Sequence, residues 1–179
     1  MAVGNLEFIK SASASTTTRL NLTDCFNDKY DVFQILIPKL DVANTNSFLT
    51  LQFLDTSDTV ISGSNYDTAN LRMASFSAFI DDRFTNQAGI RFLAQLHTTS
   101  ADGMGLSINV FNPYDSSSYT FITNQTSGQS SSGVIGNKSI AVLKDTQTCT
   151  GISITVENSG GSTFTNGIDN IEVSVFGVK

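Results

Sequence analysis

A few residues could carry out acid–base or nucleophilic chemistry. His97 is the single histidine, and a Ser-His-Asp hydrolase would need it, but the chain has no Gly-x-Ser-x-Gly turn to present a serine. Paired acids such as Asp81 and Asp82, or Asp55 and Asp58, can serve hydrolysis or bind Ca²⁺. Neither pair has the ligand spacing of a calcium loop. We therefore expect His97 at a strand end or in a loop, and both acidic pairs in solvated turns, with Asp81 and Asp82 directly after a strand.

The chain has two cysteines, Cys25 and Cys149. Its first residues lack the basic and apolar stretches of a secretory signal, which predicts folding in a reducing cytoplasm. We expect two free thiols packed as small hydrophobic groups, with a single disulfide as the alternative. Zinc-ligand spacing, a phosphate-binding loop and a dinucleotide fingerprint are missing from the sequence. The sequence thus predicts no catalytic residues, no metal and no cofactor.

The charge of the chain limits its partners. The formal net charge is −6 and the isoelectric point is near 4.5, so no basic surface for nucleic acid or an anionic membrane is expected. No apolar run approaches the roughly 20 residues that a membrane-spanning helix needs. We predict neither nucleic acid nor membrane as a partner.

Composition indicates which elements must position any site. Charged residues make up 15% of the chain, against roughly 25% in an average domain, and only three residues are Glu. Polarity comes instead from 44 Ser plus Thr and 15 Asn, which favour strands, turns and loops over helices. The composition predicts an all-β protein, an antiparallel β-sandwich of jelly-roll type.

Apolar and β-branched residues alternate with a period of two along the chain, and we find no helical pattern. We predict about ten strands, with Pro38 ending the third because proline cannot donate a hydrogen bond to a sheet. The segments that support this prediction are 5–9, 17–22, 30–37, 49–53, 71–80, 90–96, 106–110, 119–123, 139–143, 152–156 and 171–175.

The spacing of these segments predicts one domain over residues 1–179. Residues 1–16, which include a Ser/Ala/Thr stretch, are expected to form an N-terminal arm. Residues 123–138 are rich in Ser and Gly and are expected to form a long exposed loop, because uncharged polar residues do not build a core.

Aromatic residues could form a recognition surface. The chain has 13 Phe, 4 Tyr and no Trp, and Phe prefers the core or a subunit interface. Phe8, Phe53 and Phe92 each have a polar neighbour in an alternating segment and are expected in the core. Tyr114, Asp115 and Tyr119, around a run of three serines, are the best candidates for an exposed recognition loop.

The order of strand and turn segments resembles that of small β-sandwich virion structural proteins of tailed bacteriophages, particularly phages of marine bacteria and cyanobacteria. The segments that carry the resemblance are 17–22, 28–35, 48–54, 61–68, 106–114, 149–156 and 168–178. The chain has no collagen-like repeat, heptad segment or separate anchoring domain, so it resembles a compact decoration subunit more than a fibre shaft.

The resemblance implies a non-enzymatic protein made in the host cytoplasm and located in the virion. Its partners would be the major capsid protein or tail proteins, and a symmetric virion implies a homo-oligomer, with a trimer favoured. The family has no catalytic residues to carry over. The alternative function is a receptor- or glycan-binding module of a tail fibre that contacts host surface glycans. A secreted polysaccharide-active enzyme is a third reading, which the missing signal sequence and single histidine disfavour.

Overall fold

The structure is a computed structural model that describes residues 5–44, 47–96, 103–130, 132–158 and 160–179. These residues form twelve strands and contain no helix that could cross a membrane. The prediction of an all-β sandwich is confirmed, with twelve strands in place of about ten. The strands are β1 (Leu6–Thr17), β2 (Arg19–Leu22), β3 (Val32–Val42), β4 (Ser47–Leu54), β5 (Tyr66–Ala74), β6 (Ser77–Gln87), β7 (Ile90–Leu96), β8 (Met104–Phe111), β9 (Thr120–Ser130), β10 (Gly133–Leu143), β11 (Gly151–Glu157) and β12 (Ile168–Val178).

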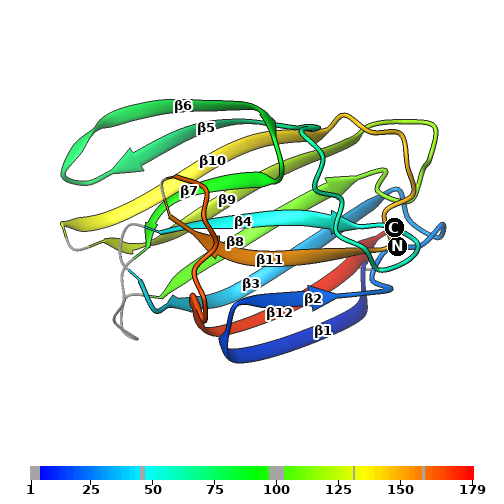
Figure 1. Ribbon diagram of the computed structural model, residues 1–179, viewed down its shortest axis with the longest axis horizontal. Coiled ribbons are helices and arrows are strands. Elements are labelled where there is room, and N and C mark those ends of the chain that lie inside the picture. Colours follow the sequence, from blue (N-terminus) through cyan, green and yellow to red (C-terminus); the bar gives the residue numbers. More distant parts are fainter. Residues whose placement is uncertain (1–4, 45–46, 97–102, 131, 159) are drawn as a thin grey trace.

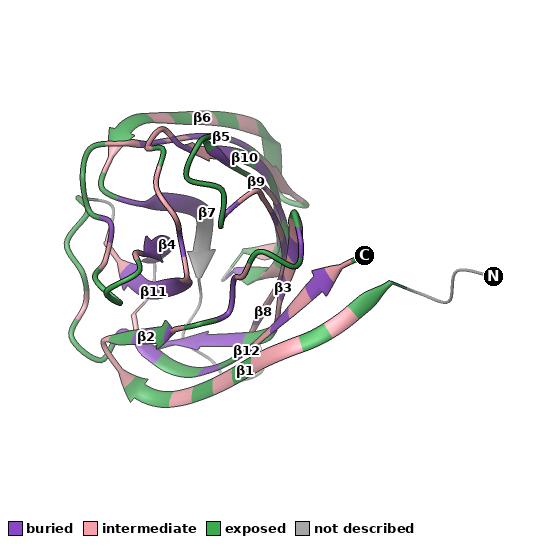
Figure 2. Ribbon diagram, turned by 90° about the vertical axis from the view of Figure 1, so that its right-hand side faces the viewer, coloured by how far each residue is buried: buried purple, intermediate pink, exposed green. Residues whose placement is uncertain are grey.

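The strands form two antiparallel sheets of unequal width (Figure 1). The large sheet has the order β1-β12-β3-β8-β9-β10-β5-β6, and the small sheet has the order β2-β11-β4-β7. Seen end on, the large sheet curls around the small one (Figure 2). From β2 to β8 the chain alternates between the sheets, except that β5 and β6 form a hairpin within the large sheet. Strands β8, β9 and β10 then form a meander in the large sheet, and the arrangement is of jelly-roll type. One face of the large sheet therefore packs on the small sheet, and its other face is the outer surface.

The core lies between the two sheets, where each strand turns alternate side chains inward (Figure 2). Phe53 and Phe92 are fully buried, as expected, and Phe33 packs edge to face against Phe26 with ring centroids 4.8 Å apart. Phe8 is 58% exposed, so its prediction as a core residue is wrong. Its strand, β1, lies at the edge of the large sheet, and its ring points away from the small sheet.

Polar side chains are also buried between the sheets. On the inner face of the large sheet, Ser139 Oγ donates a hydrogen bond to Asn70 Oδ1 (2.6 Å), and Asn137 Nδ2 donates to Ser139 Oγ (2.8 Å). Asn70 Nδ2 donates to the backbone oxygen of Arg91 on β7 (3.3 Å). The Arg91 side chain in turn pairs with Glu157 on β11 (3.4 Å). The hydrogen bond from Asn70 to Arg91 therefore links the large sheet to the small sheet, in addition to apolar packing.

The predicted loop at 123–138 is wrong, because these residues belong to the hairpin of β9 and β10. The two strands pair in register from Thr120 opposite Leu143 to Ser130 opposite Gly133. The inward positions of this hairpin include Asn124, Thr126, Asn137 and Ser139, which are buried although polar. Because polar residues occupy both faces, the alternation of apolar and polar residues that marks a strand is missing.

Three other boundaries differ from prediction. The N-terminal arm is largely strand β1, paired with β12 along its whole length. The predicted strand 71–80 is two strands, because the chain reverses at Ser75 and Phe76 between β5 and β6. Pro38 does not end β3; the strand continues to Val42 with a register shift between Ile37 and Leu40, where the missing N–H interrupts the ladder.

Candidate functional site

The predicted recognition residues follow β8, in the connection to β9. Tyr114 and Asp115 lie together at a hollow of about 160 Å³. Tyr119 is 45% exposed but does not line this hollow. The structure thus joins two of the three predicted residues. The remaining residues around the hollow are Asp28, Tyr30, Asp31 and Asn112.

The Asp115 carboxylate is already engaged within its own loop. Its Oδ1 atom accepts hydrogen bonds from Ser117 Oγ (2.7 Å) and from the Ser117 backbone N–H (2.8 Å). These bonds stabilise the charged form and lower the pKa of Asp115 below its ordinary value of 3.8. Asp115 therefore shapes the turn, and Tyr114, with 38% of its surface exposed, is the residue of this hollow best placed to meet a ligand.

The acidic residues that were considered for catalysis or metal binding do not lie together in one site. Asp55 and Asp58 lie in a turn, as expected, and Asp55 Oδ1 caps it by accepting from two backbone N–H groups. The placement of Asp81 and Asp82 after a strand is wrong, because both lie within β6, where the carboxylate of Asp81 is 3.6 Å from Arg83. His97 lies outside the described residues. Among the described residues, no three acidic, Cys or His side chains are grouped to hold a metal ion.

Both cysteines are free and buried, as predicted. Burial away from water raises the pKa of Cys25 and of Cys149 to about 12, because the thiolate form loses its solvation. A thiol with such a pKa carries little thiolate at neutral pH and is a poor nucleophile. We therefore assign both cysteines to the core and not to a site.

The outer face of the large sheet carries a row of apolar side chains that was not predicted from the sequence. In six successive strands, β1, β12, β3, β8, β9 and β10, the residues paired with one another at one level are all apolar and turned outward. Neighbouring strands lie about 4.8 Å apart, so the row extends for about 24 Å. We call it the outer row, and its members are Leu6, Val178, Val32, Phe111, Phe121 and Val142.

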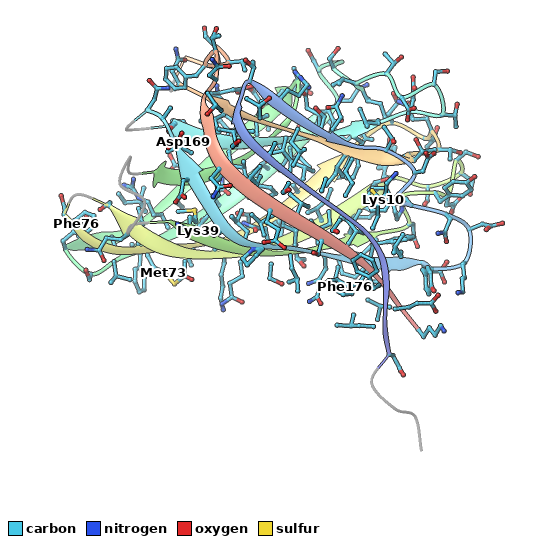
Figure 3. The ribbon with its side chains drawn as sticks, turned by 90° about the horizontal axis from the view of Figure 1, so that it is seen from below. Lys10, Lys39, Met73, Phe76, Asp169 and Phe176 are labelled. Carbon is cyan, nitrogen blue, oxygen red and sulfur yellow. The ribbon has the colours of Figure 1, made fainter. Side chains whose placement is uncertain are left out.

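The outer row lies at the end of the sheet where the chain termini lie (Figure 1). Leu6 and Phe121 are each about half exposed, at 51% and 52%. One level inward, Phe8 and Phe176 extend the apolar surface, with ring centroids 5.8 Å apart. Figure 3 shows Phe176 on this side of the molecule, with Met73 and Phe76 at the opposite end of the sheet. Contiguous exposed apolar surface of this kind marks interaction sites in soluble proteins.

Two grooves lie beside the row on the same outer face. One, of about 460 Å³, is almost wholly apolar and has Phe121, Ile140 and Val142 on its β9–β10 side and Arg83 across from them. The other, of about 530 Å³, is lined by both polar and apolar side chains, and we call it the polar groove because Gln125, Asn109 and Lys138 lie in it beside Leu71 and Ile140. Ile140 and Ala69 border both grooves. The outer face therefore passes from an apolar end to a polar middle.

The sequence contains one local signal of the outer row. Four row members stand directly beside an inward apolar residue, as in Phe121-Ile122 and Val142-Leu143. Such pairs interrupt the alternation of apolar and polar residues that is expected of a strand with one solvent-exposed face. Only the register between strands shows that the interruptions meet at one level.

Comparison with known proteins adds no family to this description. No protein-family model, curated protein sequence or solved structure gives a significant match to the chain.

Proposed function

We propose that the chain is a non-enzymatic structural protein of a tailed-bacteriophage virion, a capsid decoration or tail appendage subunit. It is made in the host cytoplasm and binds the major capsid protein or a tail protein by burying the outer row. The observation that carries the proposal is the outer row itself, six aligned apolar side chains on the outer face of the wider sheet.

The chemistry of this surface fits protein binding. The buried centres of protein interfaces are depleted in charge and enriched in aromatic residues. The outer row has no charged member, and Phe8, Phe111, Phe121 and Phe176 bring four rings to the same end of the sheet. Burying a whole apolar side chain of this size contributes about 1.5–3 kcal/mol, so a few such residues suffice for a stable contact.

The architecture also agrees with the resemblance in segment order described above. Double-sheet jelly rolls recur in viral capsid proteins and in lectins, although a fold alone does not determine a function. Mounting on a symmetric particle favours a homo-oligomer, and we propose a trimer. Sedimentation equilibrium of the purified protein tests this part, and a strictly monomeric protein at all concentrations would contradict it.

The second candidate is a receptor- or glycan-binding module of a tail fibre. The observation that favours it is the partly exposed Tyr114 at a hollow, with the half-exposed Tyr119 on the same loop. A tyrosine ring offers an apolar face together with a hydroxyl group, which suits contact with a sugar.

One experiment separates the two candidates. Purified protein is incubated with capsids and tails that lack it, and in parallel with host cells, and bound protein is measured after sedimentation. The virion role predicts saturable binding to particles. Binding to cells together with no binding to particles would contradict it and favour the receptor-binding module.

A further inference from the structure

The polar groove on the outer face is built from two neighbouring levels of the large sheet. At one level Ser107, Gln125, Lys138 and Leu71 follow one another across β8, β9, β10 and β5. At the next level the same four strands carry Asn109, Thr123, Ile140 and Ala69. The small side chains leave room between the longer ones, and the groove has a volume of about 530 Å³. This volume falls in the range of about 300–1,000 Å³ that is typical of small-molecule sites.

Several polar groups in this groove are free to bind a ligand. The side chains of Gln125 and Lys138 make no hydrogen bond or ion pair with any residue in the described part of the chain. Asn109 Nδ2 donates one long hydrogen bond to Thr123 Oγ1 (3.4 Å), and its carboxamide oxygen is left to accept another. The groove therefore offers donors and acceptors side by side.

Apolar groups alternate with these polar ones. Leu71 is 42% exposed and Ile140 is 65% exposed, and both border the groove together with Ala69. A ligand that fits must present hydroxyl groups and C–H surface at the spacing of adjacent strands, about 4.8 Å. Sugar rings have both kinds of surface.

We propose that this groove binds a neutral saccharide chain. Gln125 and Asn109 exchange hydrogen bonds with sugar hydroxyl groups, Lys138 donates to a hydroxyl oxygen, and the C–H faces of the rings pack on Ile140 and Leu71. This site is distinct from the hollow at Tyr114, and it does not depend on the proposed docking of the outer row.

The charges around the groove favour a neutral ligand over an acidic one. Lys138 is the only charged side chain that lines the groove among the described residues. Beyond Leu71 in the same level comes Asp81, whose negative charge is paired with Arg83. Among the described lining residues Lys138 is a single cation, and it does not hold a polyanion because the net charge of −6 opposes one.

The test is a titration of the full chain with neutral hexasaccharides of glucose, mannose, xylose, galactose and N-acetylglucosamine, with polygalacturonate as the acidic probe. Binding is followed by chemical-shift changes of backbone amides, which detect millimolar affinities. We expect at least one neutral probe to bind, with shifts on β8, β9, β10 and β5 and little change when salt is raised, because no ion pair is involved.

Variants locate the site. Gln125→Ala and Lys138→Ala should each weaken binding about three- to tenfold, as expected for the loss of one or two hydrogen bonds. Ala69→Leu, which fills the groove without removing a polar group, should also weaken it. Gln129→Ala is the matched control, because Gln129 lies on the same exposed face of β9 outside the groove. All four variants change exposed residues, and their urea midpoints verify that each is folded.

Three results would overturn the proposal. No binding of any neutral probe would exclude the site. Binding that Tyr114→Ala abolishes and Gln125→Ala leaves unchanged would move the saccharide to the other hollow. Salt-sensitive binding of polygalacturonate alone would exclude a neutral ligand. None of these results bears on virion docking, which requires particles and no sugar.

Discussion

Glu7 fixes the first residues of strand β1 beside the outer row. Its carboxylate accepts hydrogen bonds from Lys29 Nζ (2.6 Å) and from Lys179 Nζ (2.5 Å), one from the segment before β3 and one from the C-terminal residue. These bonds lower the pKa of Glu7 from its ordinary value of 4.5 to about 2, and the bond from Lys179 has the largest effect. Leu6 and Phe8 flank Glu7, so the same charges help to present two apolar residues of the proposed docking surface.

We predict that Glu7 contributes to stability in a pH-dependent way. The folded-state pKa is depressed, so the contribution is fully present above about pH 4.5 and is lost as the pH falls toward 2. Urea midpoints of the wild type and of Glu7→Gln, measured across this range, should differ at neutral pH and converge in acid. The difference should also shrink in high salt, because the groups are exposed. Equal midpoints at all pH values would contradict the prediction.

The buried hydrogen-bonded cluster of Asn70, Asn137 and Ser139 supports a second prediction at this scale. Ser139 Oγ bonds to Asn70, Asn137 and Asn124, so Ser139→Ala removes three buried hydrogen bonds. Asn70 and Asn137 keep the bond between them (3.2 Å), but the Asn124 amide nitrogen loses its partner. We expect a loss of about 1–3 kcal/mol in the free energy of unfolding. Ser174→Ala is the control, since Ser174 lies on the outer face of β12, and it should change stability by less than about 0.5 kcal/mol. A Ser139→Ala protein as stable as the control would show that water replaces the missing bonds.

Among the elements, β12 depends on one glycine. Gly177 pairs with Glu7 on β1 and with Phe33 on β3, and the Tyr30 ring covers its inner side. A Cβ atom at this position would lie 2.5 Å from Tyr30 Cδ2, well inside van der Waals contact. Because the ring is packed against Phe33 (centroids 5.7 Å apart), it cannot easily move aside.

Gly177→Ala should therefore destabilise the protein by about 1–3 kcal/mol, the usual cost of overpacking. Gly105→Ala on β8 is the matched control, because a Cβ there comes no closer than 3.4 Å to any atom outside its chain neighbours. Thermal unfolding of both variants checks the prediction. If both variants unfold at the same temperature as the wild type, the prediction is contradicted, and the Tyr30 ring moves aside more easily than its packing indicates.

Element by element, the sequence predicts strands where one face is apolar and the other polar. The alternation of Leu106, Ile108 and Val110 in β8 is of this kind, and all three are buried. The prediction of strands from alternation fails for β9 and β10, where the buried residues Asn124 and Asn137 occupy inward positions. A buried amide satisfied by neighbouring strands has the same sequence signature as an exposed one, so the hairpin could not be told from a polar loop.

The candidate sites were predicted less completely, for a related reason. Tyr114 and Asp115 were found because a turn is encoded by consecutive residues. The outer row and the polar groove join residues from as many as six strands, such as Leu6 and Val142. Their alignment is set by the register between strands, which short-range patterns do not contain.

At the scale of the whole molecule, the unequal sheets determine which surface is free. The small sheet covers part of the inner face of the large one, and none of the described strands packs on the outer face of the large sheet. Charged residues and the register shift near Phe8 disfavour pairing at the edge strands β6 and β1. Association through this open face, with its apolar row, is then favoured over association through the edges.

The most direct test of this account is binding of outer-row variants to virion particles that lack the protein. Phe121→Ser and Leu6→Ser should each reduce affinity about tenfold or more, because each removes an apolar contact from the docking surface. Phe79→Ser is the control, since Phe79 is 70% exposed on β6 but lies outside the row. We predict that the control binds as the wild type does. Equal binding by all three variants would show that the outer row is not the docking surface.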